Sequence, residues 1–115
     1  MDICDLSEEI ASLGPSGRRS LGTMDGCQIG IARFSSHPRW ERHQSGDELL
    51  HVIDGQLDLT VLTGNGPQQS TLGAGSMAVV PRGCWHSPRP VGPVTLLYVS
   101  PSTGNEVCDD LEPPR

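Results

Sequence analysis

The stretch Trp40–Gly55, WERHQSGDELLHVIDG, places polar residues inside a segment that otherwise has the pattern of β-strands. Buried strands avoid histidines and carboxylates unless these are paired or hold a metal. Residues two apart in a strand share one face, so Glu41 and His43 point the same way, and Glu48 begins the next strand. The stretch therefore predicts polar groups that converge in an apolar cavity, where a divalent metal is the simplest explanation and His86 the best fourth partner.

The rest of the chain predicts an all-β fold, because apolar residues alternate in short runs between its 14 glycines and 10 prolines. Asp54-Gly55 is a signal for a hairpin turn. About eight short strands are typical of a sandwich or a barrel. The expected strands are 27–34, 40–43, 48–53, 57–62, 70–72, 77–80, a stretch around 85–86, and 94–100.

The two ends of the chain are expected to lie outside this barrel. Residues 5–13 predict a short helix, because Asp5 and Glu8 have the spacing of a capping box. We therefore assign 1–19 to an N-terminal helix or arm, 20–101 to the barrel and 102–115 to an acidic C-terminal tail. The tail is interpreted either as disordered or as an arm that clasps a second subunit, and its few apolar residues favour disorder.

Composition excludes several classes of function. The net charge is -6, and all eight basic residues are arginine. An acidic chain without a basic cluster is a poor ligand for nucleic acid or for an anionic membrane, and a chain without lysine forms no Schiff base. No apolar run has transmembrane length, and the N-terminus lacks the pattern of a secretory signal. We therefore expect a cytoplasmic protein whose four cysteines are reduced.

Two motifs carry a resemblance to a known family. The run His43-x4-Glu48-x6-Gly55 matches the second half of GxxxxxHxHxxxxExxxxxxG, the first cupin motif. The run Gly75-x5-Pro81-x-Gly83-x2-His86 matches GxxxxxPxGxxHxxxN, the second. Over residues 20–101 the chain resembles a small single-domain cupin. It departs from the pattern at three positions, which are Ser35 and Pro90 in place of the outer Gly and Asn, and Glu41 in place of the first His.

The resemblance implies a double-stranded β-helix, a small jelly-roll barrel that in many similar proteins forms a homodimer. It implies one divalent metal, Mn, Fe, Zn or Ni, held by His43, Glu48 and His86. We expect a metalloenzyme that acts on a small, possibly anionic, molecule by oxygenase, isomerase or lyase chemistry. The alternative is a non-catalytic module that binds a sugar or a small acid.

Glu41 has three competing interpretations. It could be the fourth metal ligand, giving a site of two imidazoles and two carboxylates. It could instead be a catalytic base beside a 2-His-1-carboxylate triad. In the third interpretation no metal binds, and Glu41 pairs with an arginine such as Arg33 or Arg82.

Other polar residues receive more ordinary interpretations. His51 has the opposite parity to Glu48 and should point away from the cavity, and His37 lies in a loop. Cys84 is expected to be a small buried core residue. Four arginines are candidates to hold an anionic substrate by bidentate contacts: Arg33, Arg39, Arg82 and Arg89.

Overall fold

The protein, seen in a computed structural model that describes residues 1–36 and 39–110, is built almost entirely of strands. His37 and the last five residues of the predicted tail lie outside the described residues. No helix in the described part of the chain is long and apolar enough to cross a membrane. The elements are α1 (Leu6–Ala11), β1 (Arg18–Met24), β2 (Cys27–Phe34), β3 (Trp40–His43), β4 (Glu48–Thr63), β5 (Gly66–Gly73), β6 (Met77–Val80), β7 (His86–Pro101) and β8 (Asn105–Cys108).

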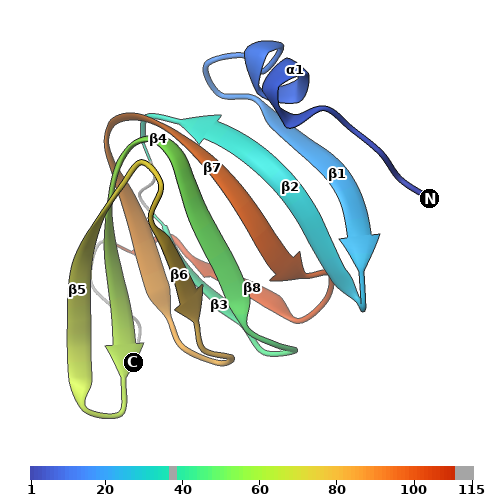
Figure 1. The fold of residues 1–115 in the computed structure, drawn as a ribbon. Coiled ribbons are helices and arrows are strands. Elements are labelled where there is room, and N and C mark those ends of the chain that lie inside the picture. The colour runs from blue at the N-terminus through green and yellow to red at the C-terminus, as the bar shows by residue number, and fades with distance from the viewer. Residues whose placement is uncertain (37–38, 111–115) are drawn as a thin grey trace.

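The strands form one antiparallel sheet that curls around an interior (Figure 1). Its order is β1-β2-β7-β3-β8, and β4 pairs with β5, β6 and β7. The all-β prediction is confirmed. β1 was missed, since its sequence RRSLGTM has no clean alternation and its register with β2 shifts between Ser20 and Gly22.

The two long strands β4 and β7 correct the predicted hairpin at Asp54-Gly55. β4 runs through these residues, and its register against β7 shifts on both sides of Asp54. Gly55 has φ 89°, and a Cβ there would lie 2.3 Å from the carbonyl oxygen of Pro93. The Asp-Gly pair therefore marks a bend in one continuous strand, where a bulge replaces the expected turn. Beyond the bend β4 exchanges β6 for β5 as its second neighbour.

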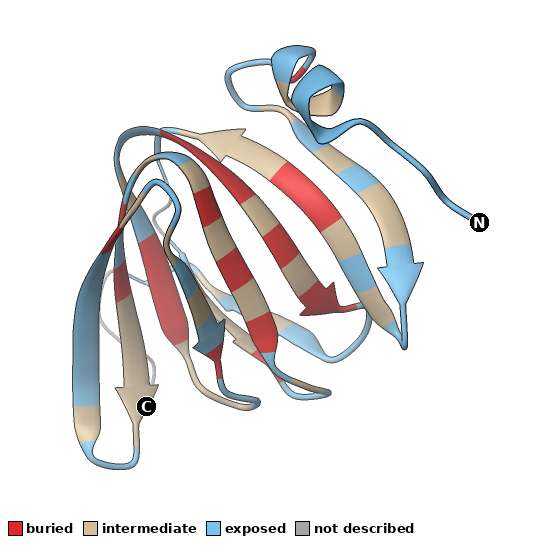
Figure 2. Cartoon of the chain, viewed as in Figure 1, coloured by how far each residue is buried: buried red, intermediate tan, exposed pale blue. Residues whose placement is uncertain are grey.

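The hydrophobic core lines the inside of the curl, where buried and less buried residues alternate along the first part of β4 and along 96–100 of β7 (Figure 2). This period of two is what a strand with one buried face produces. The core consists of Leu50, Val52, Leu57, Leu59, Leu72, Val80, Val94, Leu96 and Tyr98.

The N-terminal helix is docked on the sheet through an arginine. Asp5 caps α1 by accepting the backbone N–H of Glu8 at 3.1 Å, as the sequence predicts. Arg33 donates to the carbonyl oxygens of Ile10 and Leu13, and its Nε donates to Thr95 Oγ1. A helix this short is not stable alone, so these contacts and the burial of Leu13 hold it in place.

The C-terminal segment differs from the expected disordered tail. Residues Asn105–Cys108 form β8, which pairs antiparallel with the whole of β3. Arg42 on β3 forms an ion pair with Glu106, and Arg42 also lies over the ring of Trp85. Cross-strand pairs of this kind stabilise a short strand that its own few apolar residues would not. The segment thus belongs to the same sheet as the predicted ligands.

Candidate metal centre

The four side chains singled out in the sequence come from three strands. Glu41 and His43 lie on β3, while Glu48 begins β4 and His86 begins β7. The backbone of β3 pairs with that of β7 at Glu41 and His86, which places these two residues directly opposite one another. The predicted convergence is therefore observed.

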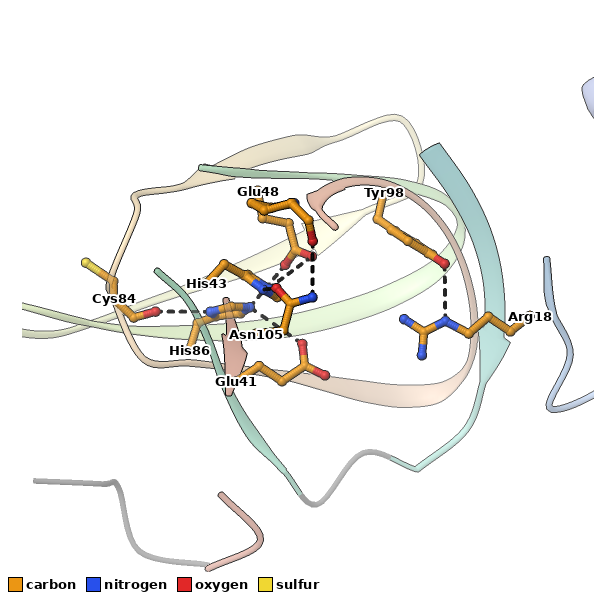
Figure 3. A network of polar contacts seen from close by, with 9 residues as sticks. Arg18, Glu41, His43, Glu48, Cys84, His86, Tyr98 and Asn105 are labelled. Carbon is orange, nitrogen blue, oxygen red and sulfur yellow. Dashed lines mark hydrogen bonds and ion pairs between the residues drawn. The ribbon is translucent and has the colours of Figure 1, made fainter. Parts of the chain in front are cut away.

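These side chains approach one another closely (Figure 3). Glu48 lies between the two imidazoles, with Oε1 3.1 Å from His86 Nε2 and Oε2 3.2 Å from His43 Nε2. Glu41 Oε2 lies 3.8 Å from His86 Nε2. The exposed fraction is 0 % for His86, 5 % for Glu48 and 8 % for His43, so three of the four donors are shielded from water.

The donor set fits a divalent metal. One donor atom from each of the four residues lies within 4.8 Å of all the others. Two donors on opposite sides of one ion are separated by roughly 4.2 Å, twice a metal–nitrogen bond, so small side-chain adjustments suffice. Among the described residues, His43 Nε2 is the one buried side-chain nitrogen or oxygen without a hydrogen-bond partner. A buried, unpartnered imidazole nitrogen facing two carboxylates is the arrangement that a cation satisfies.

Contacts behind the imidazoles orient them. His43 Nδ1 donates to Asn105 Oδ1 at 2.7 Å, and Asn105 Nδ2 donates to the carbonyl oxygen of Pro101 at 3.1 Å. His86 Nδ1 donates to the carbonyl oxygen of Cys84 at 3.2 Å. With the proton held on Nδ1 in each neutral ring, each Nε2 presents its lone pair to the centre of the cluster. Partners of this kind fix the tautomer of metal-binding histidines.

The electrostatics of the cluster favour charged groups despite their burial. Burial alone would raise the pKa of Glu48, but the adjacent imidazoles of His43 and His86 lower it to about 2. Burial alone would lower the pKa of His43, yet Glu48, Asn105 and Glu41 together raise it. A carboxylate that stays ionised in a buried site is suited to binding a cation.

A pocket of about 190 Å³ opens beside the cluster. Glu41 and Glu48 form part of its wall, and apolar side chains form much of the rest. The apolar wall residues are Ala32, Phe34, Leu50, Pro88 and Leu96. The cluster is therefore accessible to a small molecule.

The arginines of the pocket differ from those expected. Of the four candidates for anion binding, Arg33 alone lines the pocket, and its hydrogen bonds go to Thr95 and to the carbonyls that dock α1. Arg39 forms an ion pair with Asp109. Arg18 lines the pocket and was not among the candidates. It lies in the segment assigned to the N-terminal arm, where no pattern marked it.

The family follows from a match to the central part of the chain. The sequence profile of the cupin domain matches residues 33–100. The protein is a member of the cupin domain family. The matched segment contains β3, β4, β5, β6 and β7 up to residue 100. All four clustered residues of this cupin therefore lie inside it, while Arg18 and Asn105 lie outside. A search of the curated proteins found no match.

Solved structures show the same fold. A cupin-2 domain protein from Shewanella frigidimarina superposes with a TM-score of 0.71 and 22% identity, covering 86% of this chain and 94% of that one. Hydroquinone 1,2-dioxygenase from Sphingomonas, solved with 4-hydroxybenzoate bound, has a TM-score of 0.66 and 22% identity, covering 84% and 71%. Oxalate oxidase has a TM-score of 0.65 and 21% identity, covering 85% and 59%.

Proposed function

We propose that this cupin binds one divalent metal through His43, Glu48, His86 and Glu41, and acts as a metalloenzyme on a small molecule. The observation that carries the proposal is the buried Nε2 of His43, which makes no hydrogen bond and lies 3.2 Å from the Glu48 carboxylate inside the cluster. Two imidazoles and two carboxylates form a donor set suited to Mn²⁺, Fe²⁺, Ni²⁺ or Zn²⁺. When bound, such a metal supplies Lewis acidity and, for iron or manganese, redox chemistry.

Glu41 is the residue with two possible roles in this site. Its side chain is 26 % exposed, against 7 % for Glu48, so it lies nearer the solvent. It also lines the pocket. If the Glu41 carboxylate binds the metal, it completes the ligand set. If it does not bind the metal, it is within reach of a bound substrate and can accept a proton from it. We favour the ligand role, because the 3.8 Å separation from His86 Nε2 already suits a shared ion.

The chain's own residues determine what kind of substrate fits. The pocket admits only a small molecule, and its apolar walls exclude water from one side of the ligand cluster. Two neighbours of the same fold, hydroquinone 1,2-dioxygenase and oxalate oxidase, carry names of oxygen-dependent enzymes. Oxygenase or oxidase chemistry is therefore the first reaction class to test, ahead of isomerase and lyase chemistry.

The test is reconstitution of the purified chain with each of the four metals, followed by turnover and binding assays against small acids and phenols. Oxygen uptake with the iron or manganese form, absent in His86→Ala, supports an oxygen-dependent enzyme. Metal-dependent conversion without oxygen uptake supports an isomerase or a lyase. Saturable binding with no conversion in any metal form overturns the enzyme and supports the non-catalytic binding module instead.

A further inference from the structure

A second functional feature lies on the wall of the same pocket. Arg18 Nε donates to the hydroxyl of Tyr98 at 3.1 Å, and the guanidinium carbon lies 5.2 Å from the centre of the Tyr98 ring (Figure 3). Both residues line the pocket together with Glu41 and Glu48. The register of the sheet continues from Arg18 on β1 through Ala32 on β2 to Leu96 on β7, so Arg18 stands on the inner face.

The backbone of β2 is shaped to admit the Tyr98 ring. Gly30 lies opposite Tyr98 in the register, and a Cβ at Gly30 would lie 2.4 Å from the Tyr98 hydroxyl oxygen. Any larger residue would push the ring away from Arg18. The Arg18–Tyr98 pair, which we call the arginine clamp, is thus supported by a third residue on a third strand.

The arginine clamp leaves one edge of the guanidinium open. Its hydrogen bond to Tyr98 uses Nε, and among the described residues no hydrogen bond or ion pair occupies Nη1 or Nη2. Arg18 lines the pocket, and the residue is exposed. Paired N–H groups of an arginine in a fixed orientation bind a carboxylate in a bidentate way.

The arginine N–H groups of the pocket favour an anion with a single carboxylate. Arg33 also lines the pocket, but each of its three nitrogens already donates to Thr95, Leu13 or Ile10. Arg18 is therefore the arginine of the pocket that keeps an edge for a ligand. One carboxylate binds that edge, and a second carboxylate on the same molecule would find no further arginine edge to bind.

We propose that the pocket binds a small monocarboxylate. Its carboxylate group binds the Nη edge of Arg18. Its apolar part lies against the pocket wall that leads to the four clustered donors. The reaction of such a substrate depends on the proposed metalloenzyme function, but its binding to Arg18 does not. The pocket volume of about 190 Å³ corresponds to roughly six water molecules of liquid. The ligand is therefore small, with a short hydrocarbon part that matches Ala32, Phe34 and Leu96.

Butanoate and its neutral analogue butanamide provide a matched pair of probes. Binding of each is measured by protein NMR titration on the full chain loaded with Zn²⁺, and again on the metal-free chain. The variants are Arg18→Gln and Tyr98→Phe, with Arg39→Gln as the control, since Arg39 is a surface arginine paired with Asp109 away from the pocket. Zinc affinity is measured separately for each protein.

The proposal predicts that butanoate binds about tenfold tighter than butanamide, and that Arg18→Gln removes this preference while zinc affinity changes little. Tyr98→Phe should lose part of the preference, and Arg39→Gln none of it. Equal binding of the two probes, or a preference that survives Arg18→Gln, overturns the proposal even if zinc binds. If zinc fails to bind while the Arg18-dependent preference persists in the metal-free chain, the metalloenzyme fails and the carboxylate site stands.

Discussion

Asn105 accepts a hydrogen bond from Nδ1 of His43 at 2.7 Å, and this contact ties the C-terminal strand to the ligand cluster. The amide cannot reverse its orientation freely, because its Nδ2 donates to the carbonyl oxygen of Pro101. The proton of neutral His43 is thereby kept on Nδ1, and Nε2 faces Glu48. A residue beyond the matched cupin segment thus takes part in preparing the site.

Replacing Asn105 by Ala should lower metal affinity about 10- to 100-fold, since the partner that orients His43 is removed. Nitrogen NMR shifts of His43 should show a mixture of tautomers in the metal-free variant. Metal affinity is read by competition with a chelator. Val107→Ala is the control, because Val107 lies on the same strand and is 52% exposed. An unchanged tautomer and affinity in Asn105→Ala would contradict this role.

Replacing Glu41 by Gln should weaken metal binding about tenfold or more while leaving the fold intact, since its side chain is 26 % exposed. Glu106→Gln is the matched control. It also removes one carboxylate near β3, but that carboxylate pairs with Arg42. Equal metal affinity in the two variants would show that Glu41 is a neighbour of the metal and not a ligand. Thermal unfolding of each variant serves as the check on folding.

The metal-free protein should be most stabilised by its buried Glu48–His43 pair in mildly acidic solution. Glu48 has its pKa lowered from 4.5 to about 2, so its contribution is present above pH 4.5 and is lost as the pH falls toward 2. His43 has its pKa raised from 6.5, so its contribution is present below pH 6.5 and is lost as the pH rises through the folded-state value. The window of full stabilisation is therefore pH 4.5 to 6.5.

Denaturant unfolding of the metal-free protein between about pH 3 and pH 8 measures this window. The Glu48 contribution is about 3–4 kcal/mol, since its pKa falls from 4.5 to about 2 and each pKa unit corresponds to about 1.4 kcal/mol. In Glu48→Gln the losses of stability below pH 4.5 and above pH 6.5 should both become smaller. A stability curve with the same shape in both proteins would show that the pair does not control it.

Replacing Gly55 by Ala should destabilise the protein by about 1–3 kcal/mol, because the residue has φ 89° and an added Cβ would meet Pro93 O at 2.3 Å. Gly73→Ala is the control, since a Cβ there meets nothing within 4 Å. Denaturant midpoints of the two variants give the comparison. If Gly55→Ala is no less stable than Gly73→Ala, the bend in β4 does not depend on glycine.

The short strands and the cluster were predictable because their signals are local. The strands at Trp40–His43 and Met77–Val80 have the predicted bounds. Alternation along β3 also put Glu41 and His43 on one side. The start of the next strand supplied Glu48, and the need for a fourth group pointed to His86, which the two motifs then supported. The pairing of β3 with β7 places His86 opposite Glu41.

The remaining features depend on contacts distant in sequence. In sequence, the bend at Gly55 resembles a hairpin turn because both use an Asp-Gly pair with the glycine at positive φ. Only the pairing of β4 with β7 distinguishes them. β8 has too few apolar residues to be recognised, and it forms because β3 has a free edge. Asn105 and Arg18 lie in segments without a motif. The homodimer and the cytoplasmic location stay predictions.

Elemental analysis of the purified protein tests the central claim most directly. The chain is prepared without an affinity tag or a chelator, reconstituted separately with Mn²⁺, Fe²⁺, Ni²⁺ and Zn²⁺, and compared with His86→Ala. We expect close to one tightly held metal per chain for at least one of the four, and a large loss in His86→Ala, because that fully buried imidazole contacts both carboxylates of the cluster. Failure of the unsubstituted chain to retain any of the four metals, or equal retention by His86→Ala, would contradict the metal centre.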